Sequence, residues 1–433
     1  MNKKRIDVIS LGCSKNLVDS ERLLKQLELS GFQAFHNSDN VDGDIVIINT
    51  CGFIGDAKEE SINTILTYAE AKNEGRIKEL YVMGCLSERY RDDLLAEIPE
   101  IDRIYGKFDW VNIVSDIIKR NPATMPYDRV ITTPSHYTYL KIAEGCNRFC
   151  AFCAIPLITG RYKSRPIEEI LEEVRMLVGK GVKEFNVIAQ DLSSYGLDIY
   201  KRLALPELID RMAEIDGVKW IRLHYAYPSE FPHEILDVMA RHSNVCNYLD
   251  IALQHINNDV LKNMRRHITK EETLALIRTI REKVPGIHIR TTLMVGFPGE
   301  TDEAFNELKE FVREAKFERM GAFAYCEEDD TYAAKNFSDS IPQEVKESRL
   351  EEIMTIQEDV ALESNQSKIG KTMTVVIDRE EPDYFVGRTE FDSPEVDPEV
   401  LIDKDDRLTV GNFYDVEITD ALPFELMAKL KDF

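Results

Sequence analysis

Three of the chain's eight cysteines come directly after apolar runs that are typical of buried strands. Cys13 ends "VISLGC", Cys51 ends "DIVIINTC" and Cys85 ends "ELYVMGC". The carboxyl ends of parallel strands share one edge of a sheet, and open α/β folds bind their ligands there. We therefore expect the three thiols to converge on a common site.

The chemistry of that site has three interpretations. Small cysteines could simply fill the tops of the strands, because free cysteine is often buried. A structural zinc ion needs four ligands, and no fourth cysteine or histidine is evident. Three thiolates around an iron–sulfur cluster with one open iron fit the pattern better. A glycine stands beside each cysteine, which we interpret as allowing the backbone to approach a bulky inorganic group: Gly12, Gly52 and Gly84.

A second group of cysteines is more closely spaced. The loop "EGCNRFCAFCAIP" contains Cys146, Cys150 and Cys153 in a C-x3-C-x2-C spacing. Three ligands on one tight loop can hold a cubane cluster and leave its fourth iron open to a substrate. Zinc and coincidence are the alternatives, but the sequence lacks the paired knuckles that are usual for zinc.

The elements that position these cysteines alternate between strand and helix. Residues 1–130 repeat this alternation three times, which predicts an open parallel α/β sheet. One expected helix is "SERLLKQLELSGF". Another, "DAKEESINTILTYAEAKNEG", places Ile62, Ile65 and Leu66 on one side, and a third is "SERYRDDLLAEI".

Residues 136–363 continue the alternation and predict a partial or full (β/α) barrel. The second cysteine loop follows "YTYLKIAE", the expected first strand, and so lies at the carboxyl end where barrel enzymes work. The later strands are expected in the runs "KEFNVIAQD", "WIRLHYAYP", "NYLDIALQH", "HIRTTLMVGFP" and "RMGAFAYCE". One long charged helix then closes the segment.

Residues 364–433 change to short alternating runs without helices, which predicts a small antiparallel β-barrel. Three phenylalanines there fit strand spacing and are expected in the core: Phe385, Phe391 and Phe413. The stretch "NPATMPYDRVITTPSHYTY" is expected to be a linker between the first two domains. The whole is an α/β protein of three domains.

Composition narrows the class of protein further. No uncharged apolar run among the 433 residues approaches the length of a membrane span, and the N-terminus is a poor signal peptide. We expect a cytoplasmic protein, in which clustered cysteines indicate metal or redox chemistry. A net charge of −24 disfavours non-specific binding to nucleic acid, DNA included.

The second cysteine loop resembles the signature of radical S-adenosylmethionine (SAM) enzymes. "NVIAQDLSSYG" is similar to the family's methionine-binding segment, and "TTLMVGFPGET" to its adenine-side motif. The resemblance implies that Cys146, Cys150 and Cys153 hold the cluster to which SAM binds, and that its cleavage gives a 5′-deoxyadenosyl radical. The residues implied to contact SAM are Phe152, Gln190, Asp191 and Gly296.

The chain as a whole resembles the methylthiotransferases within that class. This resemblance implies two [4Fe–4S] clusters, with Cys13, Cys51 and Cys85 holding an auxiliary cluster that delivers sulfur. "SLGCSKNLVDSE" and "HYAYPSEFP" resemble the branch that modifies an aspartate β-carbon in ribosomal protein S-twelve, free or within the small ribosomal subunit. A flavodoxin- or ferredoxin-type electron donor is implied. The alternatives are a tRNA adenosine as substrate, and a non-catalytic iron–sulfur protein that docks on the ribosome.

The charge of the final segment favours a protein substrate over RNA. Residues 364–433 contain 17 Asp and Glu against 8 Lys and Arg. Such a barrel should repel phosphates and attract a basic partner, so we expect it to dock the substrate. Two positions depart from the family pattern: Thr159 stands where arginine is usual and Asp330 where glycine is common. Cys246 and Cys326 match no motif and are expected to serve packing.

Overall fold

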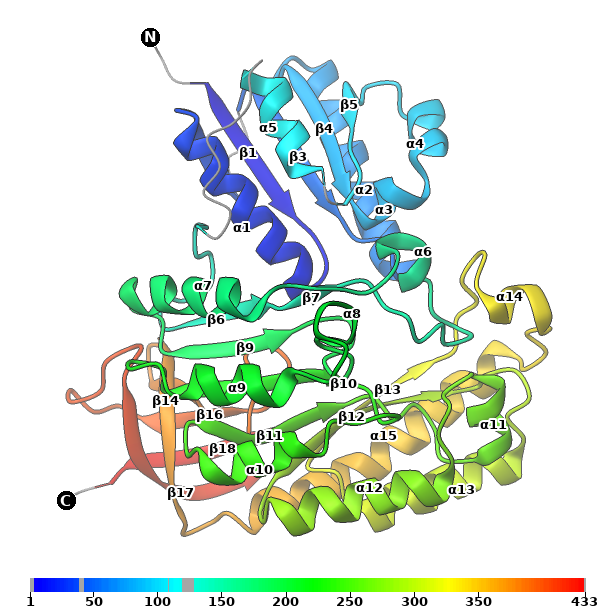
Figure 1. The fold of residues 1–433 in the computed structure, drawn as a ribbon, viewed down its shortest axis with the longest axis vertical. Coiled ribbons are helices and arrows are strands. Elements are labelled where there is room, and N and C mark those ends of the chain that lie inside the picture. Colours follow the sequence, from blue (N-terminus) through cyan, green and yellow to red (C-terminus); the bar gives the residue numbers. More distant parts are fainter. Residues whose placement is uncertain (1–3, 39–42, 108, 119–127, 432–433) are drawn as a thin grey trace.

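The computed structural model, which describes residues 4–38, 43–107, 109–118 and 128–431, contains two parallel sheets, a closed barrel and one small two-stranded sheet. In Figure 1 the N-terminal sheet lies above the central sheet, and the C-terminal barrel lies beside the central sheet. Within these described ranges, no helix is long and apolar enough to cross a membrane.

The N-terminal sheet has five parallel strands in the order β2-β1-β3-β4-β5. Helices α1 and α5 cover one face, and α2, α3 and α4 cover the other. The elements in chain order are β1 (Arg5–Ser10), α1 (Ser14–Leu29), β2 (Gln33–His36), β3 (Ile45–Thr50), α2 (Gly55–Asn73), β4 (Glu79–Gly84), α3 (Cys85–Arg89), α4 (Arg91–Glu97), β5 (Arg103–Ile104) and α5 (Trp110–Ile118).

Two helices of this domain differ from the sequence expectation. The run "SERYRDDLLAEI" forms two helices, because the chain leaves helical geometry at Tyr90 (φ −121°, ψ 34°). Of the three apolar residues expected on one side of α2, Ile65 enters the core, whereas Ile62 and Leu66 are 38% and 48% exposed. The apolar side that the periodicity indicates therefore splits between the core and the surface.

The central sheet has six parallel strands in the order β13-β12-β11-β10-β9-β6 and stays open, so the barrel is partial. Its strands are β6 (Tyr137–Lys141), β9 (Glu184–Ile188), β10 (Trp220–Ala226), β11 (Val245–Ile251), β12 (His288–Val295) and β13 (Arg319–Ala324). Its main helices are α7 (Ile167–Gly179), α9 (Leu205–Ala213), α10 (Glu234–Arg241), α12 (Lys270–Lys283), α13 (Asp302–Ala315) and α15 (Gln343–Gln366). The short elements are β7 (Ala143–Glu144), α6 (Ile155–Thr159), β8 (Lys163–Ser164), α8 (Leu197–Tyr200), α11 (Asn258–Asn263) and α14 (Tyr332–Asn336).

The C-terminal barrel closes in the order β14-β15-β16-β18-β17. Its strands are β14 (Thr372–Glu380), β15 (Tyr384–Thr389), β16 (Glu399–Asp403), β17 (Phe413–Leu422) and β18 (Glu425–Leu430). It is not wholly antiparallel, because β16 and β18 pair in parallel. Phe385 is in its core, while Phe413 and Phe391 pack against Trp220 and His288 of the central domain.

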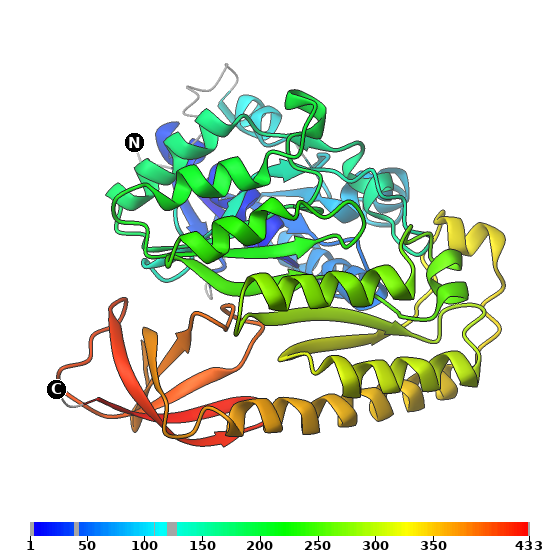
Figure 2. The same cartoon turned by 60° about the horizontal axis from the view of Figure 1, so that its bottom comes forward.

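The barrel is attached at the amino ends of the central strands, opposite the cysteine loops (Figure 2). Arg388 of the barrel binds Glu184 at the start of β9, with Nη2 and Oε2 2.8 Å apart. Arg319 at the start of β13 binds Asp392 at 2.6 Å. All four charges are buried, and each is compensated by its partner.

Only part of the expected linker behaves as one. Residues 121–127 lie outside the described residues, and Tyr137 to Tyr139 belong to β6. Between these, Arg129 is fully buried and binds Glu21 of α1 and Glu173 of α7. Arg129 therefore joins the first two domains through ion pairs.

Candidate active site

The first three cysteines lie where β1, β3 and β4 end, as the strand pattern predicts. Cys13 precedes the first residue of α1, Cys51 follows the last residue of β3, and Cys85 begins α3. These three strands are neighbours in the sheet. Cys51 lies against the loop of Cys13, since a Cβ on Gly12 would stand 2.8 Å from the Cys51 Sγ.

The glycines beside these cysteines serve the packing of the loops on one another. Gly84 has φ +107°, and a Cβ there would stand 2.5 Å from the Thr50 carbonyl oxygen. A Cβ on Gly52 would stand 2.6 Å from the backbone nitrogen of Leu86. Glycine at these positions thus allows neighbouring strand ends to approach closely, which brings the cysteines together.

Two lysines set the electrostatics of the first triad. Lys107 is 2% exposed, and its Nζ lies 3.7 Å from the Cys85 Sγ. Cys13 as a residue is exposed, but its thiol is surrounded by protein atoms. Burial would raise its pKa, but the charges of Lys15 and Lys107 outweigh this effect and hold the pKa below its ordinary value. Burial raises the pKa of the Cys51 thiol, and that of Cys85 to about 11.

The second triad lies on the loop between β7 and α6. Cys150 is buried, whereas Cys146 and Cys153 are partly exposed. Burial raises the pKa of the Cys146 thiol to about 12 and that of Cys153 further. A cavity of about 260 Å³ opens at Cys150 and Cys153, and the loop around Asp330 forms its other wall.

Two residues that the sequence did not single out contact Cys150. Arg266 donates from Nη1 to the Cys150 Sγ at 3.3 Å, and the Tyr227 hydroxyl lies 3.7 Å from the same sulfur. The Tyr227 hydroxyl also donates to the Arg266 carbonyl at 2.9 Å. Arg266 and Tyr227 therefore hold the Cys150 side chain in place by contacts with its sulfur.

Both triads have the donor set of an iron–sulfur site. Thiolates hold such clusters, and a cubane distributes its ligands over separate iron atoms. A zinc ion instead draws its ligands onto one centre. Among the described residues, no three Cys, His, Asp or Glu side chains converge on a point that suits a single ion. The cationic and apolar surroundings of both triads suit the net negative charge of a thiolate-bound cluster.

Two of the residues implied to contact SAM have partners within the chain. Asp191 is buried and accepts hydrogen bonds from Arg148 Nε at 2.7 Å, Ser194 Oγ at 2.6 Å and the Ser193 nitrogen at 2.8 Å. Gln190 donates to Glu144 at 2.8 Å. The buried Oε1 of Gln190 accepts no hydrogen bond from the described residues, so it is the atom of this pair that can still receive a ligand donor.

The other two lie on apolar packing behind the cysteine loop. Phe152 packs edge-on against Phe297, with ring centroids 6.4 Å apart. Gly296 has φ +73°, and a side chain there would strike Lys346 of α15. Its backbone nitrogen donates to Glu300 Oε1 at 3.0 Å. Glycine is required here by the turn and by the packing of α15.

The two triads adjoin across the boundary between the domains. Cys85 packs against Ala154 and Ile158, and Ala154 is the residue after Cys153. The sequence placed the two groups in separate domains, and only the family resemblance implied that they act together. The fold brings the carboxyl ends of both sheets face to face.

A buried charge network connects the same two sites. Lys107 Nζ lies 3.8 Å from Asp19 Oδ2, Lys141 binds both Asp19 and Glu144, and Glu144 accepts from Gln190. Alternating charges let each buried group be compensated by its neighbours. The network therefore runs from the first triad to the segment implied to bind SAM.

Some acidic residues of the C-terminal segment bind groups of the central domain and do not face solvent as free charges. The loop between β15 and β16 enters the inner face of the central sheet from its amino end. There Asp397 binds Arg290 at 3.2 Å and accepts from the Tyr248 hydroxyl at 2.7 Å. Glu395 accepts from Tyr139 at 3.1 Å. The negative balance of residues 364–433 thus overstates the charge that the barrel offers to a partner.

The positions that depart from the family pattern have local explanations. The Thr159 hydroxyl donates to the Ile155 carbonyl within α6 at 3.0 Å. Asp330 has φ +62°, the left-handed conformation that favours glycine. Cys246 is buried in packing as expected, but Cys326 is exposed, and its assignment to packing was wrong.

Family models match all three parts of the chain. The Radical SAM superfamily matches residues 140–312, the uncharacterized protein family UPF0004 matches residues 5–106, and a TRAM domain matches residues 369–430. Together with the cysteine loop at the carboxyl end of the central sheet, these matches define a radical SAM enzyme with an additional cysteine-bearing domain.

Curated relatives identify the family more narrowly. "Ribosomal protein uS12 methylthiotransferase RimO" of Bacteroides thetaiotaomicron is 61% identical over 99% of both chains. The protein of the same name from Phocaeicola vulgatus is 59% identical over 99% of this chain and all of its own. The chain belongs to the family of ribosomal protein uS12 methylthiotransferases. It is therefore a radical SAM transferase, which uses SAM and two [4Fe–4S] clusters.

Solved structures support the fold. The radical SAM methyltransferase TsrM from Kitasatospora setae has a TM-score of 0.57 at 15% identity, covering 77% of each chain. The cobalamin-dependent radical SAM enzyme OxsB has a TM-score of 0.54 at 11% identity, covering 82% of this chain and 56% of its own. At these identities the likeness concerns the fold alone.

Proposed function

We propose that this enzyme transfers a methylthio group to the β-carbon of an aspartate in ribosomal protein uS12. The observation that carries the proposal is the contact of Cys85 with Ala154 and Ile158, which unites the two cysteine triads in one site. Forming a carbon–sulfur bond at an unactivated carbon needs a radical and a sulfur donor held close together. Membership of the uS12 methylthiotransferase family supplies the substrate.

We assign roles to the site residues, and their positions support this assignment. Cys146, Cys150 and Cys153 hold the cluster that binds SAM, and the first triad holds the auxiliary cluster. When bound, SAM and the two clusters supply the 5′-deoxyadenosyl radical and the sulfur. The chain's own groups hold the ligands in place: Arg266 and Tyr227 at Cys150, Lys107 at Cys85.

For SAM itself, we assign a direct contact to the free Oε1 of Gln190. Asp191 acts by fixing Arg148, whose guanidinium stacks on the Tyr227 ring at 4.3 Å. The Gly296 turn and Phe152 form an apolar wall that suits adenine. Burial of this wall excludes water from the place where a radical would otherwise be quenched.

Wider assignments rest on this function. We infer domain limits of 1–130, 136–363 and 364–433, each enclosing one sheet or barrel. The electron donor is a flavodoxin- or ferredoxin-type protein, and the enzyme works in the cytoplasm, where its ribosomal substrate is made. DNA is not a partner, and a tRNA adenosine is the less favoured substrate, because the chain carries a net charge of −24.

A side-by-side assay tests the choice of substrate. Purified enzyme receives unmodified uS12, alone and within small ribosomal subunits, and unmodified tRNA under matched conditions. Mass spectrometry then follows the added methylthio group. We expect the group on a uS12 aspartate. A methylthio group on the tRNA alone would assign the enzyme to the tRNA-modifying branch. If SAM is cleaved and neither molecule is modified, neither uS12 nor tRNA is the substrate.

A further inference from the structure

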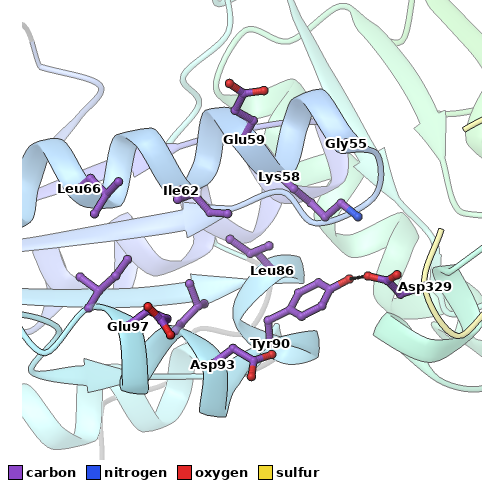
Figure 3. Close-up of a pocket in the computed structure, with 12 residues that line it drawn as sticks. Gly55, Lys58, Glu59, Ile62, Leu66, Leu86, Tyr90, Asp93, Glu97 and Asp329 are labelled. Carbon is purple, nitrogen blue, oxygen red and sulfur yellow. Dashed lines mark hydrogen bonds between the residues drawn. The ribbon is translucent and has the colours of Figure 1, made fainter. Parts of the chain in front are cut away.

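A groove of about 670 Å³ lies on the N-terminal domain between α2 and the helices α3 and α4 (Figure 3). Leu86, Leu94 and Ile98 form its buried floor. Ile62 and Leu66 of α2 form a wall that stays open to solvent, at 38% and 48% exposure. Contiguous apolar side chains left exposed in this way are typical of a surface that a partner covers.

Carboxylates stand along the rim of this groove. Glu59 and Glu97 are exposed and, among the described residues, form no ion pair, and the same holds for Asp93. Asp329 accepts a hydrogen bond from the Tyr90 hydroxyl at 3.0 Å. Among the described residues that line the groove, Lys58 is the only cation, and it shares the buried Glu328 with Arg89, at 3.0 and 3.1 Å. The rim therefore offers uncompensated negative charge around an apolar floor.

The groove borders the active site through residues that are adjacent in the chain. Leu86 on its floor follows Cys85, the ligand of the first triad that contacts the second cysteine loop. Asp329 at its end precedes Asp330, which lines the cavity at Cys150 and Cys153. A chain lying in the groove can thus continue to both triads. The C-terminal barrel, in contrast, is attached at the opposite end of the central strands.

We propose that this groove seats a segment of the protein substrate in which two or three apolar side chains are flanked by lysine or arginine. The proposal rests on the function proposed above and adds where the substrate docks. Charge complementarity favours this occupant, because ribosomal proteins are generally basic. A second copy of this chain, with a net charge of −24, is repelled by the rim, and so is an acidic electron donor.

Two pairs of variants with matched controls test the proposal. Glu59→Lys with Asp93→Lys reverses the rim, and Glu60→Lys with Asp92→Lys makes the same charge change at neighbouring exposed positions outside the groove. Ile62→Gln with Leu66→Gln makes the wall polar, and Leu29→Gln with Leu95→Gln alters two similarly exposed leucines elsewhere in the domain.

Each variant is tested as the reconstituted full chain, with purified uS12 as substrate and a chemical reductant as electron source. Both groove variants should raise the KM for uS12 by about tenfold or more, since central interface residues dominate binding. Formation of 5′-deoxyadenosine without uS12 should stay at the wild-type rate, which shows that the site is folded. Both controls should keep the wild-type KM.

Three outcomes would overturn the proposal. One is a wild-type KM in both groove variants. Another is an equal rise in the controls, which would indicate a general charge effect. The last is that the groove variants keep the wild-type KM for uS12 with the chemical reductant but turn over more slowly with a protein electron donor. That result would assign the groove to the electron donor. If wild-type enzyme does not modify uS12 at all, the proposed function fails first, independently of the groove.

Discussion

At the scale of single residues, the two triads differ in their surroundings. Cys150 faces the guanidinium of Arg266 and the hydroxyl of Tyr227, whereas Cys85 faces the ammonium of Lys107 and packs against the second loop. Each triad thus has its own positive group, and the two can be altered separately. This separation lets the radical step and the sulfur step be assigned to different cysteines.

Cys150→Ala removes a residue that we assign as a ligand of the SAM-binding cluster, and it should abolish formation of 5′-deoxyadenosine. Cys51→Ala acts on the other triad and should retain SAM cleavage while losing methylthio transfer. Chromatography of 5′-deoxyadenosine, together with the mass of uS12, measures both effects. Continued SAM cleavage by the Cys150→Ala variant would mean that the radical site is misassigned.

At the scale of elements, the ends of β3 and β4 are what bring the first triad together. Gly84 turns the chain from β4 into α3 at a φ that side chains rarely adopt, with the Thr50 carbonyl directly alongside. The sequence predicted these strand ends because each apolar run stops at a cysteine. It did not reveal that the neighbouring glycine is required by the adjacent strand.

Gly84→Ala should therefore lower the free energy of unfolding by more than about 2 kcal/mol, since it adds a clash to an unfavourable φ. Gly75→Ala is the matched control: its φ is +75°, and nothing lies within 4 Å of the added Cβ, so only about 1 kcal/mol should be lost. Urea denaturation measures both. An equal decrease in the free energy of unfolding for both variants would show that the close approach to Thr50 does not contribute to the effect of Gly84→Ala.

Other features of the site could not be predicted from the sequence, because some contacts join residues far apart in the chain and some buried residues do not follow an apolar periodicity. Arg266 contacts Cys150 across 116 residues, and the pair of arginines at 265 and 266 matches no motif in the sequence. The first turns of α1 contain the polar residues Asn16, Asp19 and Glu21, which an apolar periodicity misses although all three are buried. Asp19 and Glu21 bind Lys141 and Arg129, so their burial depends on how the first two domains meet, whereas Asn16 is buried within the N-terminal domain and accepts a hydrogen bond from Lys107.

At the scale of the whole molecule, the carboxyl ends of the two parallel sheets lie at one shared site. The C-terminal barrel contacts the amino ends of the central strands. Buried ion pairs hold both junctions, at Arg129 with Glu21 and at Arg388 with Glu184. Removing one partner of such a pair costs about 3–5 kcal/mol. The molecule therefore fixes the distance between the triads rather than leaving the domains free.

Two cluster sites in one chain predict an iron content. Anaerobically reconstituted wild-type protein should bind about eight iron atoms per chain, four for each cubane. Replacing Cys13, Cys51 and Cys85 together with alanine should lower this to about four, as measured by colorimetric iron analysis and Mössbauer spectroscopy. A wild-type value near four that the triple variant leaves unchanged would remove the auxiliary cluster from the account.

The central claim is that radical and sulfur act on the same carbon from two adjoining triads. The most direct test supplies uS12 with deuterium on its aspartate β-carbons and follows both products. We predict deuterium in 5′-deoxyadenosine together with methylthio-uS12 for the wild type, and deuterated 5′-deoxyadenosine without the methylthio product for Cys51→Ala. Methylthio-uS12 accompanied by unlabelled 5′-deoxyadenosine would contradict the claim, because the radical would then not have taken its hydrogen from the modified carbon.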